Sequence, residues 1–259
     1  MTEAVNTRSD GQTSGLASVG AVLRTRLFEL TVLVWSLPFG VVILTYFQVR
    51  RVPAEVRWAL RLWSSGFVWA ARTICGVHYM LDGLDRVPDG PVVFVSNHQS
   101  YWESIAFTAL FADINVITKS EAMDIPIFGW GLREAPMIPV FREQKGRNLR
   151  RIVKECRESL ASGRSILLFP EGTRVKPGQT KPFLRGLGLL YASTNATIIP
   201  VVNNAGHCWT EGFQVKKPGH IIMRFCEPIV PGRDPAETAT RLERTLNREK
   251  ELLPGGSFC

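Results

Sequence analysis

The sequence predicts an α/β fold in which a mostly buried central sheet is flanked by helices, preceded by an apolar helical segment at the N-terminus. After Gly83, short apolar runs alternate with helical stretches, a pattern typical of a sheet with helices on its faces. Of the 259 residues, 45% are hydrophobic and 21% are charged. This composition is that of a folded domain and excludes a mainly disordered chain.

An uncharged, strongly apolar run extends from Leu30 to Phe47, between basic residues on both sides. As a helix this run would measure about 27 Å, just short of the ~30 Å hydrocarbon core of a bilayer. Pro38 and Gly40 lie in its middle, where they weaken or kink a helix. Three placements therefore remain open: a hairpin or re-entrant anchor, a membrane span, or a buried core helix.

Residues 58–79 combine tryptophan and phenylalanine with arginine. Aromatic rings favour the headgroup level and arginines attract anionic lipid, so this stretch is predicted to be a helix lying on a membrane surface. An ordinary amphipathic helix packed on its own domain is the alternative.

The sheet elements follow in order along the chain. Apolar runs predict buried strands at 91–97, 115–118, 136–141, 165–170, 197–202 and 220–225. Helices are predicted near 103–112, 146–162 and 183–194, and Asp234-Pro235 opens an amphipathic terminal helix. Cys156 lies at core-like spacing on the second of these helices and is predicted to be structural.

The net charge indicates which classes of partner the protein favours, and the cysteine content indicates the redox state of its compartment. The net charge of +8 favours anionic partners such as nucleic acid, acidic lipid or phosphorylated substrates. Five widely spaced cysteines without a CxxC pair argue against a disulfide framework and against a zinc site. The first twenty residues carry no cleavable signal. We therefore expect a cytoplasm-facing protein in a reducing environment.

A histidine follows the first predicted strand, and a carboxylate lies five residues later, at His98 and Glu103. Across a strand-to-helix turn, the carboxylate would fix the tautomer of the imidazole and leave the other ring nitrogen as a base toward a substrate hydroxyl. Ser100 and Glu103 also fit a capping box, in which Glu103 only satisfies the start of a helix. Both interpretations stay open from the residues alone.

A second polar turn, Phe169-Pro170-Glu171-Gly172-Thr173-Arg174, follows a later buried strand. Glycine permits close backbone approach, threonine offers a hydroxyl, and arginine offers a planar fork suited to phosphate. Glu171 would hold the arginine or a substrate hydroxyl. The alternative is a polar surface turn with a Glu-Arg pair.

In this order and spacing, the blocks resemble the glycerolipid acyltransferase family, and bacterial lysophosphatidic acid acyltransferases within it. The resemblance covers roughly residues 75–230. Four blocks occur in the family's order: Asn97 to Glu103, Ile138 to Arg142, Phe169 to Arg174, and Ile199 to Val202. One position departs from the family pattern, because the usual aspartate is Glu103 here, which is one methylene longer and keeps the charge.

The resemblance implies transfer of a fatty acyl group from an acyl thioester, on coenzyme A or acyl carrier protein, to the sn-2 hydroxyl of lysophosphatidic acid. The product is phosphatidic acid for phospholipid synthesis. His98 would be the catalytic base and Glu103 would orient it. The implied substrate-binding residues are Lys119, Arg142, Glu171, Gly172, Thr173 and Arg174. A thioester is already activated, so no metal and no bound cofactor are expected.

The resemblance also implies a role for the apolar N-terminal segment in membrane association. We expect a flexible N-terminus at 1–23, a membrane-associated helical anchor at 24–80, and an acyltransferase catalytic domain at 81–259, on the cytoplasmic face of a bacterial inner membrane. The same chemistry on glycerol 3-phosphate, lyso-ornithine lipid or another lysophospholipid is the first alternative. A non-catalytic membrane lipid-binding protein is the second. Nucleic-acid binding is not expected, since no recognised motif accompanies the charge.

Overall fold

The structure is a computed structural model. It describes residues 10–49, 53–111, 113–120, 137–140, 145–184, 186–209, 214–232 and 234–255, without the side chains of residues 10–18, 42–49, 53–56 and 145–148.

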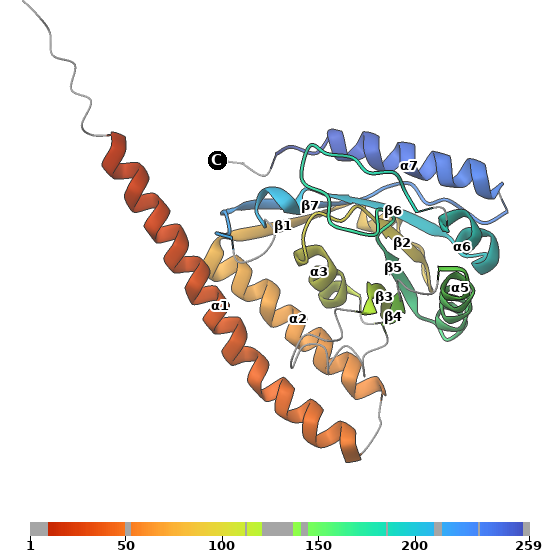
Figure 1. Cartoon of the computed structure of the whole chain (residues 1–259), viewed down its shortest axis with the longest axis horizontal. Helices are drawn as coiled ribbons and strands as arrows, with labels where there is room; N and C mark the ends of the chain where they lie inside the picture. The colour runs from red at the N-terminus through yellow and green to blue at the C-terminus, as the bar shows by residue number, and fades with distance from the viewer. Residues whose placement is uncertain are drawn as a thin grey trace, which may run out of the picture.

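Two long helices, α1 (Asp10–Val49) and α2 (Pro53–Cys75), lie side by side at the N-terminus (Figure 1). They are joined by the indole of Trp35, which donates to the carbonyl of Trp63 over 3.2 Å, and by the indole of Trp63, which donates to Ser36 Oγ over 2.9 Å. Gly66 makes this approach possible, because a Cβ there would lie 2.5 Å from the Trp35 ring.

The structure corrects two predictions for this segment. The helix α1 continues through Pro38 and Gly40, so no hairpin forms inside the apolar run 30–47. Residues 10–23, predicted to be flexible, are helical. Side chains 42–47 of the run lie outside those described. Among the residues that the structure describes, no helix combines the length and the apolar character needed to cross a membrane.

The described residues form a seven-stranded sheet in the order β1-β7-β6-β2-β5-β3-β4. All neighbouring strands are parallel except β6 and β7. The strands are β1 (Val77–Asp82), β2 (Val93–Ser96), β3 (Ile114–Lys119), β4 (Ile138–Val140), β5 (Ser165–Leu168), β6 (Ile198–Asn203) and β7 (Gly219–Phe225). The six predicted strands are confirmed.

The strand β1 was missed, because residues 77–79 were predicted as the end of the second helix. Gly76 has a φ of 67°, a conformation that ends α2 and turns the chain into an extended strand. The predicted boundary between residues 80 and 81 therefore falls inside β1, which pairs with β7 along its whole length.

Helices cover both faces of the sheet. The helix α3 (Trp102–Leu110) and α2 pack on one face, and α5 (Lys145–Ala161), α6 (Leu187–Thr194) and α7 (Pro235–Glu251) pack on the other (Figure 1). As predicted, Asp234 caps α7: its carboxylate accepts from the backbone N–H groups of Ala236 and Glu237 at 3.0 and 2.8 Å. The 3-10 helices η1 (Leu84–Arg86) and η3 (Ala205–His207) follow β1 and β6.

Candidate active site

Two of the predicted motifs meet at one edge of the sheet. The strand β2 lies between β6 and β5 and is parallel to both. The turns that follow these strands therefore lie side by side at their carboxyl ends, where open α/β sheets place ligand sites. This topology brings His98, after β2, next to the turn at 169–174, after β5.

The imidazole of His98 contacts the carboxylate of Glu103. His98 Nδ1 lies 2.9 Å from Glu103 Oε1, and Glu103 is fully buried in the first turn of α3, whereas the His98 side chain remains 19% exposed. A carboxylate at this position accepts a hydrogen bond from Nδ1–H and leaves Nε2 as the ring nitrogen with a lone pair. The arrangement is that of an oriented general base.

The predicted capping box is present in part: the N-cap of α3 is Tyr101, without a side-chain capping hydrogen bond, but Glu103 does bond the backbone of the turn before it. Glu103 Oε1 also accepts from the backbone N–H groups of Gln99 and Ser100 at 2.7 and 2.8 Å. Ser100 Oγ donates to Glu103 Oε2 over 2.6 Å and accepts from the N–H of Trp102 over 3.0 Å. The two interpretations of Glu103 are therefore compatible, because one carboxylate closes the turn and contacts the histidine.

The segment after β5 packs directly against His98. The ring of Phe169 stacks on the imidazole, with 4.0 Å between centroids and 20° between planes. The N–H of Val175 donates to the carbonyl of His98 over 2.7 Å. These contacts fix the plane of the imidazole and its main chain, while Glu103 fixes the rotation of the ring.

Glycine is required in the turn at 169–174. Gly172 has a φ of 65°, and a Cβ added there would lie 2.9 Å from Leu184 Cδ1. An L-residue would be strained in this conformation and would also displace the leucine.

The carboxyl group of Glu171 is buried beside His98. Burial raises its pKa to about 7, against smaller opposing effects from the backbone N–H groups of Glu171 and His98 and from the His98 and Lys250 side chains. Its Oε2 atom is buried and has no hydrogen-bond partner among the described residues. A buried oxygen without a partner is unusual in a folded protein and marks a place where a polar ligand group would fit.

The predicted cations lie in different places. Arg174 follows Gly172 and Thr173 in the turn and is exposed, and its charge reaches Tyr101, next to Glu103's turn. Lys119 is the last residue of β3. Because β3 is the next strand after β5 in the sheet and runs parallel to it, Lys119 lies at the same edge of the sheet as the turn at 169–174. Arg142 lies outside the described residues.

Two contacts were not predicted from the sequence: Ser100 as a partner of the Glu103 carboxylate, and Phe169 as a ring stacked on His98. Phe169 could have been found, since it directly follows β5, which neighbours the strand before His98. Cys156 is fully buried, and burial raises the pKa of its thiol to about 12, as a structural cysteine requires.

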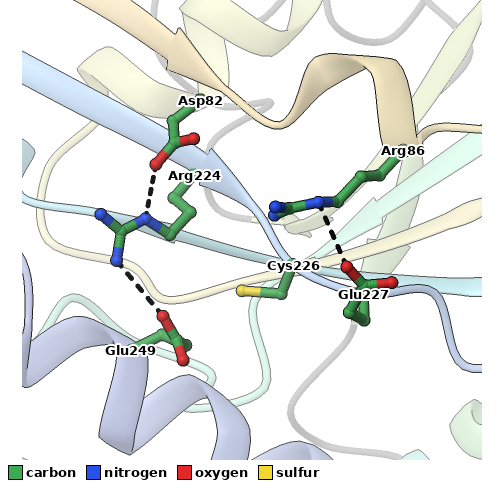
Figure 2. A pocket seen from close by; sticks show the side chains of 6 residues that line it. All are labelled: Asp82, Arg86, Arg224, Cys226, Glu227 and Glu249. Atoms are coloured by element: carbon green, nitrogen blue, oxygen red, sulfur yellow. Dashed lines mark hydrogen bonds and ion pairs between the residues drawn. The ribbon is translucent and has the colours of Figure 1, made fainter.

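A polar cavity of about 370 Å³ lies elsewhere, at the opposite edge of the sheet (Figure 2). Its lining charges pair with one another: Arg224 contacts Asp82 at 2.7 Å and Glu249 at 3.2 Å, and Arg86 contacts Glu227 at 3.3 Å. Because β1 and β7 run opposite to β2, the ends that carry these residues point away from His98. The cavity is not part of the candidate active site.

Known proteins are similar to this chain in sequence and in fold. A model of the acyltransferase family matches residues 78–204, which include both motifs. The chain is 32% identical over 201 residues to the 1-acyl-sn-glycerol-3-phosphate acyltransferase of Pseudomonas aeruginosa, covering 77% of each protein. It is 33% identical over 137 residues to a chloroplastic 1-acyl-sn-glycerol-3-phosphate acyltransferase of Arabidopsis thaliana, covering 52% of this chain and 38% of that protein. The crystal structure of the 1-acyl-sn-glycerophosphate acyltransferase PlsC from Thermotoga maritima has the same fold, with a TM-score of 0.75 over 93% of this chain and 99% of that chain at 23% identity. By its matched sequence and by the histidine and FPEGTR turns within it, the chain belongs to the acyltransferase family.

Proposed function

We propose that the protein transfers a fatty acyl group from an acyl thioester to the sn-2 hydroxyl of lysophosphatidic acid, giving phosphatidic acid for phospholipid synthesis. The observation that carries the proposal is the contact between His98 and the buried Glu103 beside the FPEGTR turn. The relatives from Pseudomonas and Arabidopsis, named as 1-acyl-sn-glycerol-3-phosphate acyltransferases, support this choice of acceptor.

His98 Nε2 takes the proton of the acceptor hydroxyl as its oxygen attacks the thioester carbonyl carbon. A C–O bond forms and the C–S bond breaks. The imidazolium then gives its proton to the leaving thiolate, so the enzyme returns to its starting state. Glu103 holds the ring in the productive tautomer during both steps. The activated thioester requires no metal and no bound cofactor, and either acyl-CoA or acyl carrier protein would supply it.

The acceptor phosphate carries about −1.5 to −2 charges near neutral pH. Arg174 and Lys119, at the same edge of the sheet as His98, are the described cations proposed to bind it, together with the turn at Gly172 and Thr173. Arg142 is proposed from the family pattern alone. The unpartnered Oε2 of Glu171 is proposed to bond a hydroxyl or ester oxygen of the glycerol, because it lies buried next to His98.

The N-terminal helices are proposed to hold the enzyme on the cytoplasmic face of the inner membrane. Large apolar side chains recur on the outer face of α1 and are between 51% and 64% exposed: Leu23, Leu27, Leu30, Leu33, Val34, Leu37 and Val41. Trp58 and Trp69 of α2 are exposed as well. An apolar helix face with arginines and tryptophans nearby favours the interface between headgroups and acyl chains. An active site at this interface avoids extracting lipid chains into water.

The proposal is tested by acyl transfer with the full chain in phospholipid vesicles. Oleoyl-CoA is the donor, and lysophosphatidic acid, glycerol 3-phosphate, lyso-ornithine lipid and a lysophospholipid with a head group are compared as acceptors. We expect the highest kcat/KM with lysophosphatidic acid. A higher value with another acceptor would reassign the substrate, and absence of transfer from both acyl-CoA and acyl carrier protein to every acceptor would refute the enzymatic proposal.

A further inference from the structure

The fourth sequence block, Ile199 to Val202, contributes no side chain to the proposed chemistry. It lies in β6, where every residue is buried. The residue that follows, Asn203, is fully buried at the carboxyl end of this strand, beside the turn that holds His98. We infer that Asn203 is a positioning residue for acyl transfer, which acts by fixing the main chain on both sides of His98. This inference rests on the proposed function for its activity readout.

Asn203 and Asn97 bond each other reciprocally. Asn97 Nδ2 donates to the carbonyl of Asn203 over 2.9 Å, and the N–H of Asn203 donates to Asn97 Oδ1 over 2.8 Å. Asn203 Nδ2 donates in turn to the carbonyl of Asn97 over 2.9 Å. The carbonyl of Asn97 belongs to the peptide group that leads into His98. Where the pairing of β2 with β6 ends, hydrogen bonds of these two asparagine side chains therefore take over from the backbone hydrogen bonds between the strands.

The other neighbour of His98 is held by the same segment. Gln99 Oε1 accepts from the N–H of Gly206 over 3.0 Å, and Asn203 Oδ1 accepts from the N–H of Ala205 over 3.1 Å. Gly206 is needed for this approach, since a Cβ there would lie 3.1 Å from the Cβ of Gln99 and 2.8 Å from Pro177 Cγ. Asn203 thus orders the 203–206 segment and, through it, both residues that flank His98.

The position of the main chain matters because, in the proposed mechanism, His98 must contact Glu103 and the acceptor hydroxyl at the same time. Glu103 must stay within hydrogen-bond reach of Nδ1, and Nε2 must meet the acceptor hydroxyl. Displacement of a catalytic group by ~1 Å reduces a rate by about 10²-fold, even when the cause lies outside the reacting atoms. Buried side-chain amides with good geometry are suited to prevent such displacement, because they bond only in one arrangement.

The next residue provides a matched control. Asn204 is also an asparagine and is 3% exposed, but its hydrogen bonds point away from His98. Its Oδ1 accepts from the N–H of Ile222 in β7 over 2.8 Å, and its Nδ2 donates to the carbonyl of Pro254 over 2.8 Å. Truncation of Asn204 removes these two hydrogen bonds and a longer one from Nδ2 to the carbonyl of His220 at 3.5 Å, none of which involves the turn that carries His98.

The experiment compares Asn203→Ala and Asn203→Ser with Asn204→Ala in the full chain, in one detergent or vesicle preparation. Thermal unfolding identifies a temperature at which each variant is folded, and the serine variant serves if the alanine variant does not fold. For Asn203→Ala we expect kcat to fall by about 10²-fold while KM for both substrates stays within about threefold. Asn204→Ala should lower the melting temperature comparably and keep kcat within about twofold of the unmodified chain.

Backbone hydrogen exchange of the same proteins supplies a readout that does not depend on turnover. The N–H groups of Gln99 and Ser100, which bond Glu103, should exchange faster in the Asn203 variants and unchanged in Asn204→Ala. Equal kcat in the two asparagine variants, or unchanged exchange at Gln99 and Ser100, overturns the inference. If the unmodified chain transfers no acyl group, the proposed function fails, and the exchange comparison still decides the role of Asn203.

Discussion

Replacement of Glu103 by aspartate, the residue usual in the family, should impair this enzyme. Glu103 Oε1 lies 2.9 Å from His98 Nδ1, and Oε2 lies 2.6 Å from Ser100 Oγ. Loss of one methylene withdraws the carboxylate by up to about 1.5 Å, the length of a C–C bond. The contact with His98 would then exceed hydrogen-bond reach unless the turn moved inward.

The expected magnitude follows from the lost contacts. A misplaced base should reduce kcat by about 10- to 100-fold. Because Glu103 is fully buried and accepts four hydrogen bonds from His98, Gln99 and Ser100, loss of one or two of them should cost about 2–4 kcal/mol of unfolding free energy. Acyl transfer from oleoyl-CoA in vesicles and thermal unfolding measure the two effects.

Glu103→Gln is the companion variant, since it keeps the length of the side chain and removes its charge. It should preserve more of the stability than Glu103→Asp does and still lose activity. If Glu103→Asp retained the kcat of the unmodified enzyme, the contact seen between His98 and Glu103 would not determine the orientation of the base, and this reasoning would be wrong.

Three further predictions concern the FPEGTR turn and the membrane face. Gly172→Ala should cost about 1–3 kcal/mol more than Gly178→Ala: both glycines have positive φ, but only at Gly172 would an added Cβ meet a leucine within 2.9 Å. Equal melting temperatures would contradict this. Burial raises the pKa of Glu171 from 4.5 to about 7, so the native state keeps a proton that the unfolded chain releases, and stability is lost as the pH rises through this window. Glu171→Gln should therefore gain up to about 3 kcal/mol over the unmodified chain between pH 4 and pH 8, and parallel melting curves across pH would refute it. Leu30→Glu should weaken vesicle binding at least about tenfold in co-sedimentation, whereas Val230→Glu, exposed on another face, should not; equal binding of both would contradict the membrane role of α1.

The strands around the site were predictable because they are short, continuous apolar runs. The apolar runs of β2, β5 and β6 are typical of strands that are buried on both faces of a sheet. The strand β1 was missed, because it directly follows the long amphipathic helix α2. Only the conformation of Gly76 separates the helix from the strand. Pro38 did not interrupt α1, since the missing N–H affects one hydrogen bond in a helix that also packs along α2.

The motifs of the candidate site were predictable from the sequence. The residues that hold these motifs in place through long-range hydrogen bonds were not. The spacing of His98 and Glu103 identified the pair, and the structure adds that the capping function and the histidine contact coexist. Asn203 follows the last family block and bonds Asn97, 106 residues earlier in the chain. A contact of this kind depends on the order of strands in the sheet, which no local pattern encodes.

The most direct test of the account is acyl transfer from oleoyl-CoA to lysophosphatidic acid by the full chain in vesicles, compared with His98→Ala and with His78→Ala as a control. His78 stacks on His220 in β1 and β7, and β6 separates these two strands from β2, the strand that leads to His98. The account predicts phosphatidic acid from the unmodified chain and from His78→Ala, and loss of at least about 10³-fold in kcat for His98→Ala. Undiminished turnover by His98→Ala would contradict the central claim that His98 is the base.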